Sequence, residues 1–301
     1  MIMQKIIHME SIMEIEKYLV KEGQKVNLND FSTKRDEELD RDEVENILMP
    51  NNISRMANLQ EKLYAENTSS LLIVFQAMDA AGKDSAIKHV MKGFNPQGVH
   101  VAAFKVPSSE ENDHDYLWRI HKQIPRRGEI GIFNRSHYED VLVSKVHNLI
   151  SISQLPPELQ TEDIFEVRYR QIRDYERYLF ENGTVIVKFF LHLSKDEQRE
   201  RLLERIENPQ KNWKFSAADI HERQYWDTYM KACETMLKNT STEIAPWYIL
   251  PADSKWYTRY LISEILLEKL IEMNPQFPEF PEEKREEMEK CRKLLLKEKY
   301  S

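Results

Sequence analysis

The sequence predicts an α/β protein of three layers, in which helices cover both faces of a five-stranded parallel sheet. Short apolar runs alternate along the chain with longer stretches of helical periodicity, which is typical of strands buried on both faces. Five of the seven glycines lie between residues 82 and 131. Because tight turns often need glycine, its scarcity elsewhere predicts long helices with few tight hairpins in the rest of the chain. The glycine-rich region is therefore where we expect the backbone to approach a ligand.

The composition excludes several classes of protein. A chain of 301 residues with 41% hydrophobic and 10% aromatic residues can bury a full core and is neither disordered nor collagen-like. No apolar run approaches the roughly 20 residues of a membrane span, and charged residues interrupt Met1–Lys17, so we expect no membrane anchor and no signal peptide. The two cysteines, Cys233 and Cys291, suit a reducing compartment, and we expect a cytoplasmic protein.

The charge of the chain limits its partners. A formal net charge of −8 disfavours nucleic acid, because an acidic surface repels a polyanion. Residues 168–223 nevertheless carry 12 basic against 10 acidic side chains. Any polyanion must therefore be held by a local basic groove, and this segment is where we expect it.

The elements of the first half follow from the same patterns. Residues 1–66 are predicted to form a helical extension, with helices near Ile12–Leu19 and Ser54–Ala65 on either side of an acidic stretch, Lys34–Glu45. The alternation of strands and helices then begins. We expect strands at Leu71–Phe75, Val99–Val106 and Glu129–Phe133, and helices at Lys83–Lys92, which Gly93 ends, and at Asp113–Gln123.

The second half continues the alternation. An apolar stripe predicts a helix at Asp163–Glu181. Ser194 with Glu197, and Ser216 with Asp219, have the spacing of capping boxes and predict the starts of two further helices, which run to about Glu207 and Lys238. The remaining elements are strands at Thr184–Leu193 and Trp247–Leu250, a helix across Arg259–Glu272, and a charged amphipathic helix at Pro281–Lys299 that could pack back or meet a partner.

The turn after the first of these five strands has features of a phosphate-binding loop. It joins the strand to a helix, but only Gly82 and Lys83 match the Walker A pattern, because Ala77 and Asp84 replace its first glycine and its hydroxyl residue. Backbone N–H groups at a helix start and the Lys83 ammonium still suit an anion. The alternative is an ordinary helix start with a favourable acid in its first turn. The candidate phosphate-binding residues are Ala80, Ala81, Gly82, Asp84 and Ser85 beside Lys83.

Asp79 lies in the same loop, four residues before Lys83. A carboxylate at this place repels phosphate unless a divalent cation lies between them. Asp79 is therefore a candidate Mg²⁺ ligand or general base, and the alternative is that it caps N–H groups of the loop.

A second group of candidates follows the strand Glu129–Phe133. An apolar strand that ends in a polar residue is the Walker B arrangement, whose acid holds Mg²⁺. Here that residue is Asn134, so metal binding would shift to Asp79 with Glu139 or Asp140, although both acids also suit a helix start. Arg135, at the carboxyl end of the strand, suits the charge of a phosphoryl group. We expect the nearby His137 to be packed rather than to bind a metal.

Basic residues gather on the helical pair after the fourth of the five strands. In P-loop kinases such a pair forms a lid that supplies arginines and excludes water. Acidic neighbours allow the alternative of surface ion pairs along the helix. We divide the chain into the extension 1–66, a main domain 67–275 with a lid at about 194–238, and a C-terminal helix 276–301. The lid candidates are Arg199, Arg201, Arg205 and Lys214, and a second basic group at the same end of the sheet comprises Lys105, Arg119 and Lys122.

Several blocks of the sequence, in order, resemble the polyphosphate kinase 2 family, and most closely its group that phosphorylates AMP as well as ADP. The blocks include QAMDAAGKDSAIKHV, HDYLWRIHKQIPRRGEIGIFNRSHYEDVLV and FFLHLSKDEQRERL, and the resemblance covers about residues 25–270. It implies a P-loop kinase fold with a helical lid, dependence on Mg²⁺ with Mn²⁺ as a substitute, and assembly into dimers or tetramers. It also implies reversible phosphoryl transfer between inorganic polyphosphate and the adenine nucleotides AMP, ADP and ATP.

The resemblance assigns roles to particular residues. Asp79 and Lys83 match the acid and the lysine of the family's Walker A motif, and Arg135 matches its Walker B arginine. Asn134 stands where most of the family has an acid, as in the AMP-accepting group, which leaves the metal ligands less defined. Ser85 stands where glycine is common. Arg199, Arg201 and Arg205 are all candidates for the catalytic arginine of the lid.

These residues lead to a hypothesis of in-line transfer without a covalent enzyme intermediate. Two alternatives stay open. An ATP-dependent nucleoside monophosphate kinase would need a base pocket for its donor near the loop. A non-catalytic polyphosphate-binding module would bind the chain without forming ADP or ATP.

Overall fold

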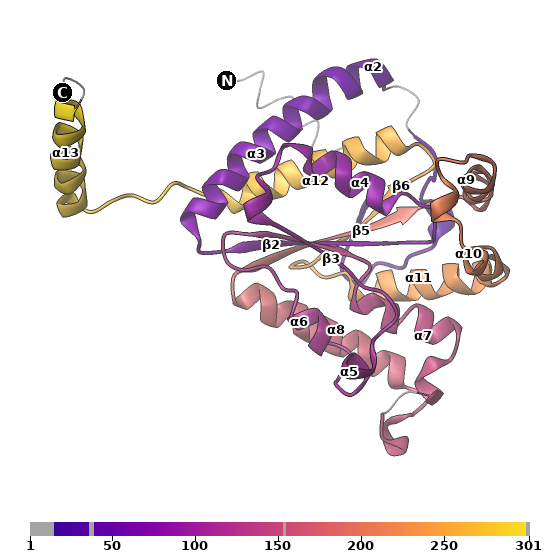
Figure 1. The fold of residues 1–301 in the computed structure, drawn as a ribbon. Coiled ribbons are helices and arrows are strands. Elements are labelled where there is room, and N and C mark those ends of the chain that lie inside the picture. Colours follow the sequence, from indigo (N-terminus) through magenta and orange to yellow (C-terminus); the bar gives the residue numbers. More distant parts are fainter. Residues whose placement is uncertain (1–14, 36–38, 153–154, 299–301) are drawn as a thin grey trace.

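A twisted sheet crosses the centre of the computed structural model, which describes residues 15–35, 39–152 and 155–298 (Figure 1). Over these residues the sheet has six strands in the order β1-β6-β5-β2-β4-β3. The strands from β2 to β6 are parallel, and β1 pairs antiparallel with β6. Their bounds are β1 Leu19–Val20, β2 Ser70–Ala77, β3 Val99–Ala103, β4 Ile130–Asn134, β5 Thr184–His192 and β6 Trp247–Pro251.

The α/β class and the five parallel strands are confirmed, and β1 is an addition to them. The sequence predicts a helix at Ile12–Leu19, but residues 12–14 lie outside the described part of the chain and Leu19 belongs to β1. The acidic stretch predicted at Lys34–Glu45 also extends over residues 36–38, which are not described. A strand of two residues has no periodicity to detect, and β1 forms because its backbone pairs with the edge of β6.

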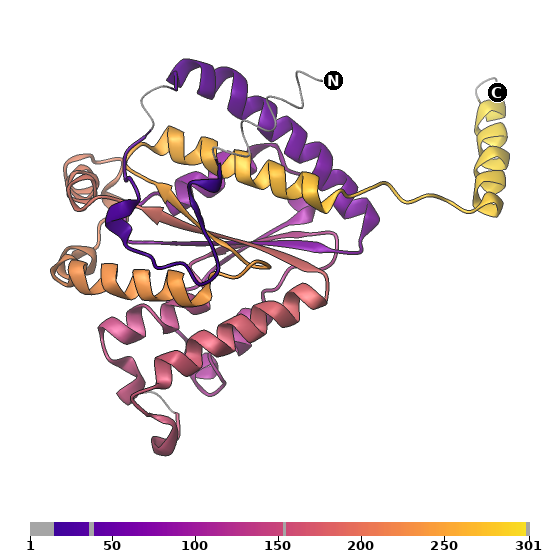
Figure 2. The ribbon, with the colours of Figure 1, turned by 180° about the vertical axis from the view of Figure 1, so that it is seen from behind.

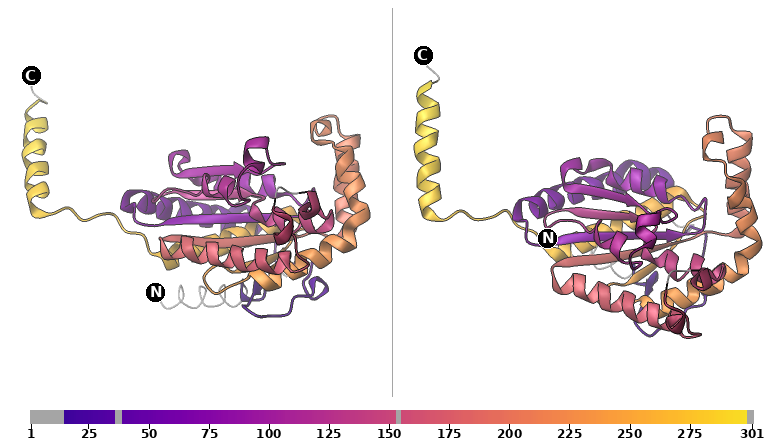
Figure 3. Two further views of the ribbon diagram at one scale, coloured as in Figure 1. Left: turned by 90° about the horizontal axis from the view of Figure 1, so that it is seen from below. Right: turned by 60° about the horizontal axis from the view of Figure 1, so that its bottom comes forward.

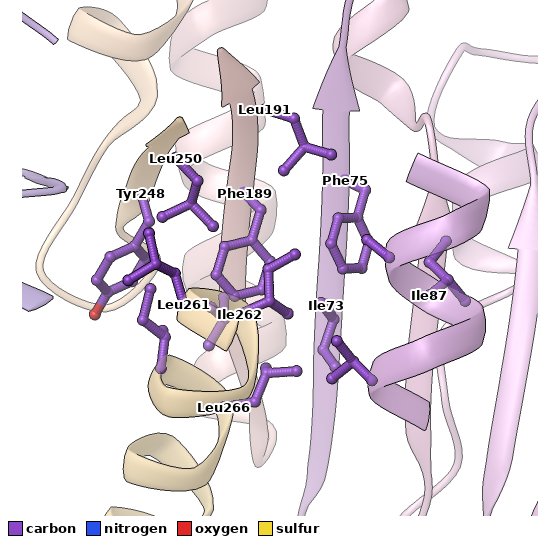
Figure 4. Close-up of a cluster of buried hydrophobic side chains, with 14 of the residues drawn as sticks. Ile73, Phe75, Ile87, Phe189, Leu191, Tyr248, Leu250, Leu261, Ile262 and Leu266 are labelled. Atoms are coloured by element: carbon purple, nitrogen blue, oxygen red, sulfur yellow. The ribbon is translucent and has the colours of Figure 1, made fainter. Parts of the chain in front are cut away.

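Three helices cover one face of the sheet: α3 Met49–Glu66, α4 Lys83–Val90 and α12 Lys255–Met273 (Figures 1 and 2). Figure 4 shows Ile262 and Leu266 of α12 beside Phe189 of β5 and Ile73 of β2, all of them buried. Because α3 packs against α12, part of the predicted extension lies in the same layer as the main domain. The predicted domain and lid boundaries stay predictions.

The opposite face is covered by α8 Ile164–Glu181, α11 Trp226–Thr240 and the short α7 Val143–Val146 (Figure 1). Val74 of β2 faces this side with Tyr169 of α8 and Met236 of α11, whereas its neighbour Ile73 faces the other core. Successive strand residues thus alternate between two apolar cores. This burial on both faces explains the continuous apolar runs in the sequence.

Two predicted helices differ from the observed ones. Within Asp113–Gln123 only α6, Trp118–His121, is α-helical. A capping box of Ser108 and Glu111 starts a separate short helix, α5 Ser109–Asn112, before it. The second predicted cap, Ser216 with Asp219, is not formed, because Asp219 binds Arg205 instead. The predicted helix after it is divided into α10 Ala217–Glu222, the 3-10 turn Arg223–Tyr225 and α11.

The remaining helices are short or lie outside the two layers. They are α2 Arg41–Glu43, a π-helical turn Val44–Leu48, α9 Lys195–Glu207 and α13 Glu282–Lys297, with further 3-10 turns that include Met91–Gly93, His137–Asp140 and Asn212–Lys214.

Two features stand outside the layers. The helices α9 and α10 rise at the edge of the sheet to which the parallel strands point, and α13 stands apart from the body after the irregular residues 274–281 (Figure 3). Among the described helices, none combines the length and the low charge that crossing a bilayer requires.

Candidate active site

The loop between β2 and α4 bends sharply around the side chain of Lys83. Ala80 and Gly82 adopt positive φ angles of 64° and 103°, a conformation that glycine adopts freely and alanine rarely does. The Lys83 Nζ donates hydrogen bonds to the carbonyl oxygens of Ala77 at 3.0 Å and Met78 at 3.5 Å. The Lys83 side chain is only 9% exposed, and the loop backbone surrounds its ammonium group.

Burial and neighbouring charges set the state of Lys83. Burial lowers the pKa of Lys83, Asp79 opposes this shift, and Arg135 adds to it. A bound phosphate would favour the charged ammonium, because an opposite charge nearby raises the pKa of a lysine. The loop is thus arranged to gain from an anion.

Asp79 and Arg135 meet at the carboxyl edge of the sheet. The strands β2 and β4 are neighbours with Phe75 opposite Asn134, so the residues that follow each strand emerge side by side. The Arg135 Nη2 lies 2.5 Å from Asp79 Oδ1. Arg135 has a φ of 63°, which is unfavourable for an arginine and re-aims its side chain at the end of the strand.

Glu139 belongs to the same group of charges. Its carboxylate lies 4.0 Å from the Arg135 guanidinium, on the 3-10 turn His137–Asp140. Burial raises the pKa of Glu139, and the charges of Arg135 and Lys83 oppose that shift. A hydrogen bond to α8 holds this turn in place, because the hydroxyl of Tyr138 donates to the buried carboxylate of Glu176 at 2.6 Å. The predicted residues Asp79, Lys83, Arg135 and Glu139 are thereby brought together.

Asp140, the other acid of this turn, faces a different set of charges. Burial raises its pKa to about 6, and Arg168 and Arg119 are the cations that oppose the shift. His137, three residues before Asp140, is buried with no described hydrogen-bond partner on either ring nitrogen, as expected for a packed residue.

The two departures from the nucleotide-binding motifs contact each other. The Asn134 amide donates to Asp84 Oδ1 at 2.6 Å, so the residue in place of the Walker B acid holds the residue in place of the Walker A hydroxyl. Ser85 is also engaged, because Arg259 of α12 donates to its Oγ at 2.6 Å. Sequence reasoning missed Arg259, which lies 174 residues away along the chain and has no local signal.

Arg201 is a clamp on the loop between β2 and α4. Its Nη1 donates to the carbonyl oxygens of Ala80 at 3.1 Å and Ala81 at 2.9 Å. Its Nη2 donates to the carbonyl oxygens of Ala252 and Asp253, and its Nε donates to Glu197 at 2.8 Å. The Glu197 side chain thus binds Arg201 and does not complete the predicted capping box. Only one of the two bonds of that box is formed, from the Glu197 N–H to the Ser194 hydroxyl. In this geometry the buried Arg201 positions the loop.

Gln198 forms a second clamp on the same loop, which the sequence did not predict. Gln198, which is 1% exposed, donates to the backbone carbonyl of Asp79 at 3.0 Å, and its own side-chain oxygen accepts from Arg223 at 2.6 Å. The signal that could have found Gln198 is its spacing from Arg201 and Leu202, because residues three and four apart share one face of a helix. All three are buried on the face of α9 toward the loop.

The other two candidate arginines of the lid, Arg199 and Arg205, lie elsewhere. Arg199 is exposed and pairs with Asp196 and Glu200, as the alternative of surface ion pairs expects. Arg205 donates to Asp219 at 2.7 Å and to the Lys214 carbonyl at 3.3 Å, so it ties α9 to α10.

The second basic group does not form one row. Arg119 is buried, donates to the Lys105 carbonyl at 2.8 Å and lies 3.6 Å from Glu111. Lys122 places its ammonium over the Trp118 ring, and Lys214 does the same over the Trp213 ring. Arg119 is thus bound by protein partners. Lys122 and the lid candidate Lys214 remain on the surface.

The site can offer a metal two carboxylates. Within the described residues, no three acidic, His or Cys side chains lie close enough to hold a metal by themselves. Asp79 and Glu139 both contact Arg135. The buried Gln76 Oε1 has no hydrogen-bond partner among the described residues. Mg²⁺ is commonly held by one or two carboxylates together with water and substrate phosphates. The donor set therefore fits Mg²⁺ that arrives with a phosphorylated substrate.

Comparisons with known proteins agree with this geometry. A family model described as Polyphosphate kinase 2 matches residues 38–278. A solved structure titled as polyphosphate kinase 2 from Arthrobacter aurescens TC1 superposes with a TM-score of 0.82 at 40% identity, over 91% of this chain and 95% of that one. The α/β fold with its phosphate-binding loop is thus the P-loop kinase fold.

Two relatives extend the comparison. An ADP-polyphosphate phosphotransferase of Rhodopseudomonas palustris is 47% identical over 284 residues, which cover 94% of this chain and 98% of the relative. An AMP/ADP-polyphosphate phosphotransferase of Meiothermus ruber is 52% identical over 223 residues, which cover 74% of this chain and 80% of the relative.

Proposed function

This chain belongs to the polyphosphate kinase 2 family and is a kinase, and we propose that it transfers the terminal phosphoryl group of inorganic polyphosphate to AMP and to ADP. The transfer is reversible, so ATP and ADP are also donors to the polyphosphate chain. The names of the two relatives support both acceptors. Asn134 in place of the Walker B acid supports AMP as one of them, through the resemblance to the AMP-accepting group.

The convergence of Asp79, Lys83, Arg135 and Glu139 at one edge of the sheet carries the proposal. An oxygen of the nucleotide's terminal phosphate attacks the terminal phosphorus of the chain in line, and the anhydride bond to the next phosphorus breaks. Lys83 and Arg135 neutralise the charge on the transferred group. Asp79 orients or deprotonates the attacking phosphate. The pair of electrons of the broken bond leaves on the shortened polyphosphate.

We propose Asp79 and Glu139 as the residues that hold Mg²⁺, with Mn²⁺ as a substitute. A metal held by these carboxylates would supply positive charge that stabilises the charge on the phosphate oxygens. Arg135 contacts both carboxylates, so the same guanidinium orients the two ligands and faces the transferred group.

The remaining candidates keep more general roles in the proposal. The backbone from Ala80 to Ser85 cradles phosphate, and the lid residues Arg199, Arg201, Arg205 and Lys214 are candidates for neutralising charge. Arg201 also holds the loop in place. Lys105, Arg119, Lys122 and Asn134 are proposed to attract or bind the substrates. A cytoplasmic location and assembly into dimers or tetramers are further parts of the proposal.

Product analysis by ³¹P NMR tests the function. The purified chain is given AMP, Mg²⁺ and polyphosphate in one sample, and AMP, Mg²⁺ and ATP in another, with the Lys83→Ala variant purified in the same way as the control for contaminating kinases. We expect ADP and then ATP in the first sample. ADP from the second sample alone would indicate an ATP-dependent nucleoside monophosphate kinase, and binding of polyphosphate without product would indicate a non-catalytic module.

A further inference from the structure

The helix α13 has an apolar side that the rest of the described chain does not cover. All of its residues are exposed, including Met288 at 53% and Leu295 at 66%. Figures 1 and 3 show the helix away from the body, joined to it only by residues 274–281. The helix also lies beyond residue 278, where the match to the family model ends. Its sequence is therefore not explained by the active site or by the core.

Three of the five apolar residues of the helix follow one side of it. At 100° per residue, Met288, Cys291 and Leu295 lie within one narrow stripe, whereas Leu296 lies about 100° away from Leu295. An isolated helix of 16 residues is only marginally stable in water, and burial of its apolar side is what usually stabilises it. The stripe therefore calls for a partner.

The charges of α13 identify that partner. Residues 282–289 carry five acidic and two basic side chains, and residues 290–297 carry four basic side chains and no acidic one. Two copies in parallel would place like charges together along their whole length. Two antiparallel copies place the acidic half of each against the basic half of the other, while the apolar stripes meet in the middle.

We propose that α13 pairs in antiparallel orientation with α13 of a second copy of this chain, with the two Cys291 residues at the crossing point. The division of charge also suits the dipole of the helix itself. The dipole, however, gives no reason for an exposed stripe of Met288, Cys291 and Leu295. Self-pairing accounts for the stripe and the charges together, and it does not depend on the reaction that the kinase domain catalyses.

The pairing is tested first by oxidation of the full chain under mild conditions, with disulfide-linked dimer measured on a non-reducing gel. Cys291 is exposed, while Cys233, the other cysteine, is buried, so a cross-link between copies reports on α13. We expect a dimer that Cys291→Ala abolishes and that Leu295→Glu reduces at least tenfold. Leu296→Glu, the same change on the neighbouring residue away from the stripe, is the matched control and should alter the yield by less than about twofold. Absence of the dimer, or equal loss in both glutamate variants, would overturn the proposal.

The orientation is tested in the Cys291→Ala background with two single-site variants, Met288→Cys and Leu295→Cys. In antiparallel helices residue 288 of one copy lies near residue 295 of the other, whereas like residues are about 10 Å apart along the axis, too far for a disulfide. We therefore expect a dimer when the two variants are mixed and at least tenfold less from either alone. Cross-linking of each variant with itself would show parallel pairing and would contradict the proposal.

Discussion

Two buried lysines of this molecule, Lys83 and Lys188, differ in how their charges are matched. Lys188 lies in the middle of β5, where its ammonium donates to Glu176 at 2.7 Å, Tyr138 at 2.9 Å and the Thr240 carbonyl at 2.7 Å. Lys83 donates to two backbone carbonyls of the loop, and the neighbouring carboxylate, Asp79, binds Arg135. Burial lowers the pKa of both lysines.

From this difference we infer that Lys188 is a structural cation and that Lys83 is a functional one. An ammonium has three donors, and those of Lys188 are all satisfied inside the core by a carboxylate, a hydroxyl and a carbonyl. Lys83 lies at the edge of a parallel sheet, where ligands of open α/β folds bind, and its partners leave its positive charge unmatched. Removing Lys83 should therefore affect catalysis, and removing Lys188 should affect folding.

The largest effect is expected at the functional lysine. Lys83→Ala should lower kcat by about 10³, which is about 4 kcal/mol of transition-state stabilisation, with little change in unfolding. Asp79→Ala should lower kcat to a similar extent. Initial rates of ADP formation from AMP and polyphosphate measure the effect, and Lys88→Ala, on the exposed side of the same helix, is the control. A near-normal turnover in either variant would show that the assigned role is wrong.

The structural lysine should give the opposite result. Lys188→Met leaves the carboxylate of Glu176 buried without its cation, and we expect the free energy of unfolding to fall by about 3 kcal/mol. Urea unfolding followed by circular dichroism measures this loss. The double variant Lys188→Met with Glu176→Gln removes both charges and should regain part of the stability. If the single variant unfolds at the same urea concentration as the parent, the ion pair is not structural.

Arg201 tests whether positioning of the Lys83 loop matters on its own. Arg201→Lys keeps one positive charge but cannot reach both the loop carbonyls and those of Ala252 and Asp253. We expect kcat to fall about 30-fold, or about 2 kcal/mol, with a smaller change in the KM for polyphosphate. Arg170→Lys, at an exposed arginine of α8, is the control. A rise in KM with unchanged kcat would instead indicate that Arg201 binds the substrate.

The smallest expected effect is a dependence of the free energy of unfolding on pH. It arises from His137, which lies close to the structural lysine, Lys188. Burial and then the charge of Lys188 lower the pKa of His137 to about 3, so the folded chain holds this imidazole neutral while the unfolded chain protonates it near pH 6.5. A lowered pKa in the folded state means that this stability is present above pH 6.5 and is lost as the pH falls toward 3. Between pH 7 and pH 5.5 the loss should be about 1 kcal/mol.

The measurement compares urea unfolding of the parent and of His137→Phe at these two pH values. The variant lacks the titrating group, so its stability should change by about 1 kcal/mol less than that of the parent over this range. Equal changes in the two proteins would mean that His137 is not held neutral in the folded state.

Local sequence patterns were sufficient for the parallel strands and for the residues that follow them. The strands β2 and β4 end in Ala77 and Asn134, and a parallel sheet brings such ends to one edge, so Asp79, Lys83 and Arg135 could be named together before their distances were known. The roles of Arg199, Arg201 and Arg205 could not be separated in this way. The charge of an arginine is the same on either face of a helix, and only packing decides that Arg201 is buried while Arg199 is exposed.

The sequence alone determined the α/β class, the order of the parallel strands along the chain and the loop that carries Lys83, because these depend on periodicity and on the residues of a single turn. Tertiary structure decided the edge strand β1, the clamp formed by Gln198 and Arg201, and the contact of Arg259 with Ser85. Each of these joins segments more than 80 residues apart, and neither propensity nor spacing within one segment specifies which distant backbone or side chain will complete it.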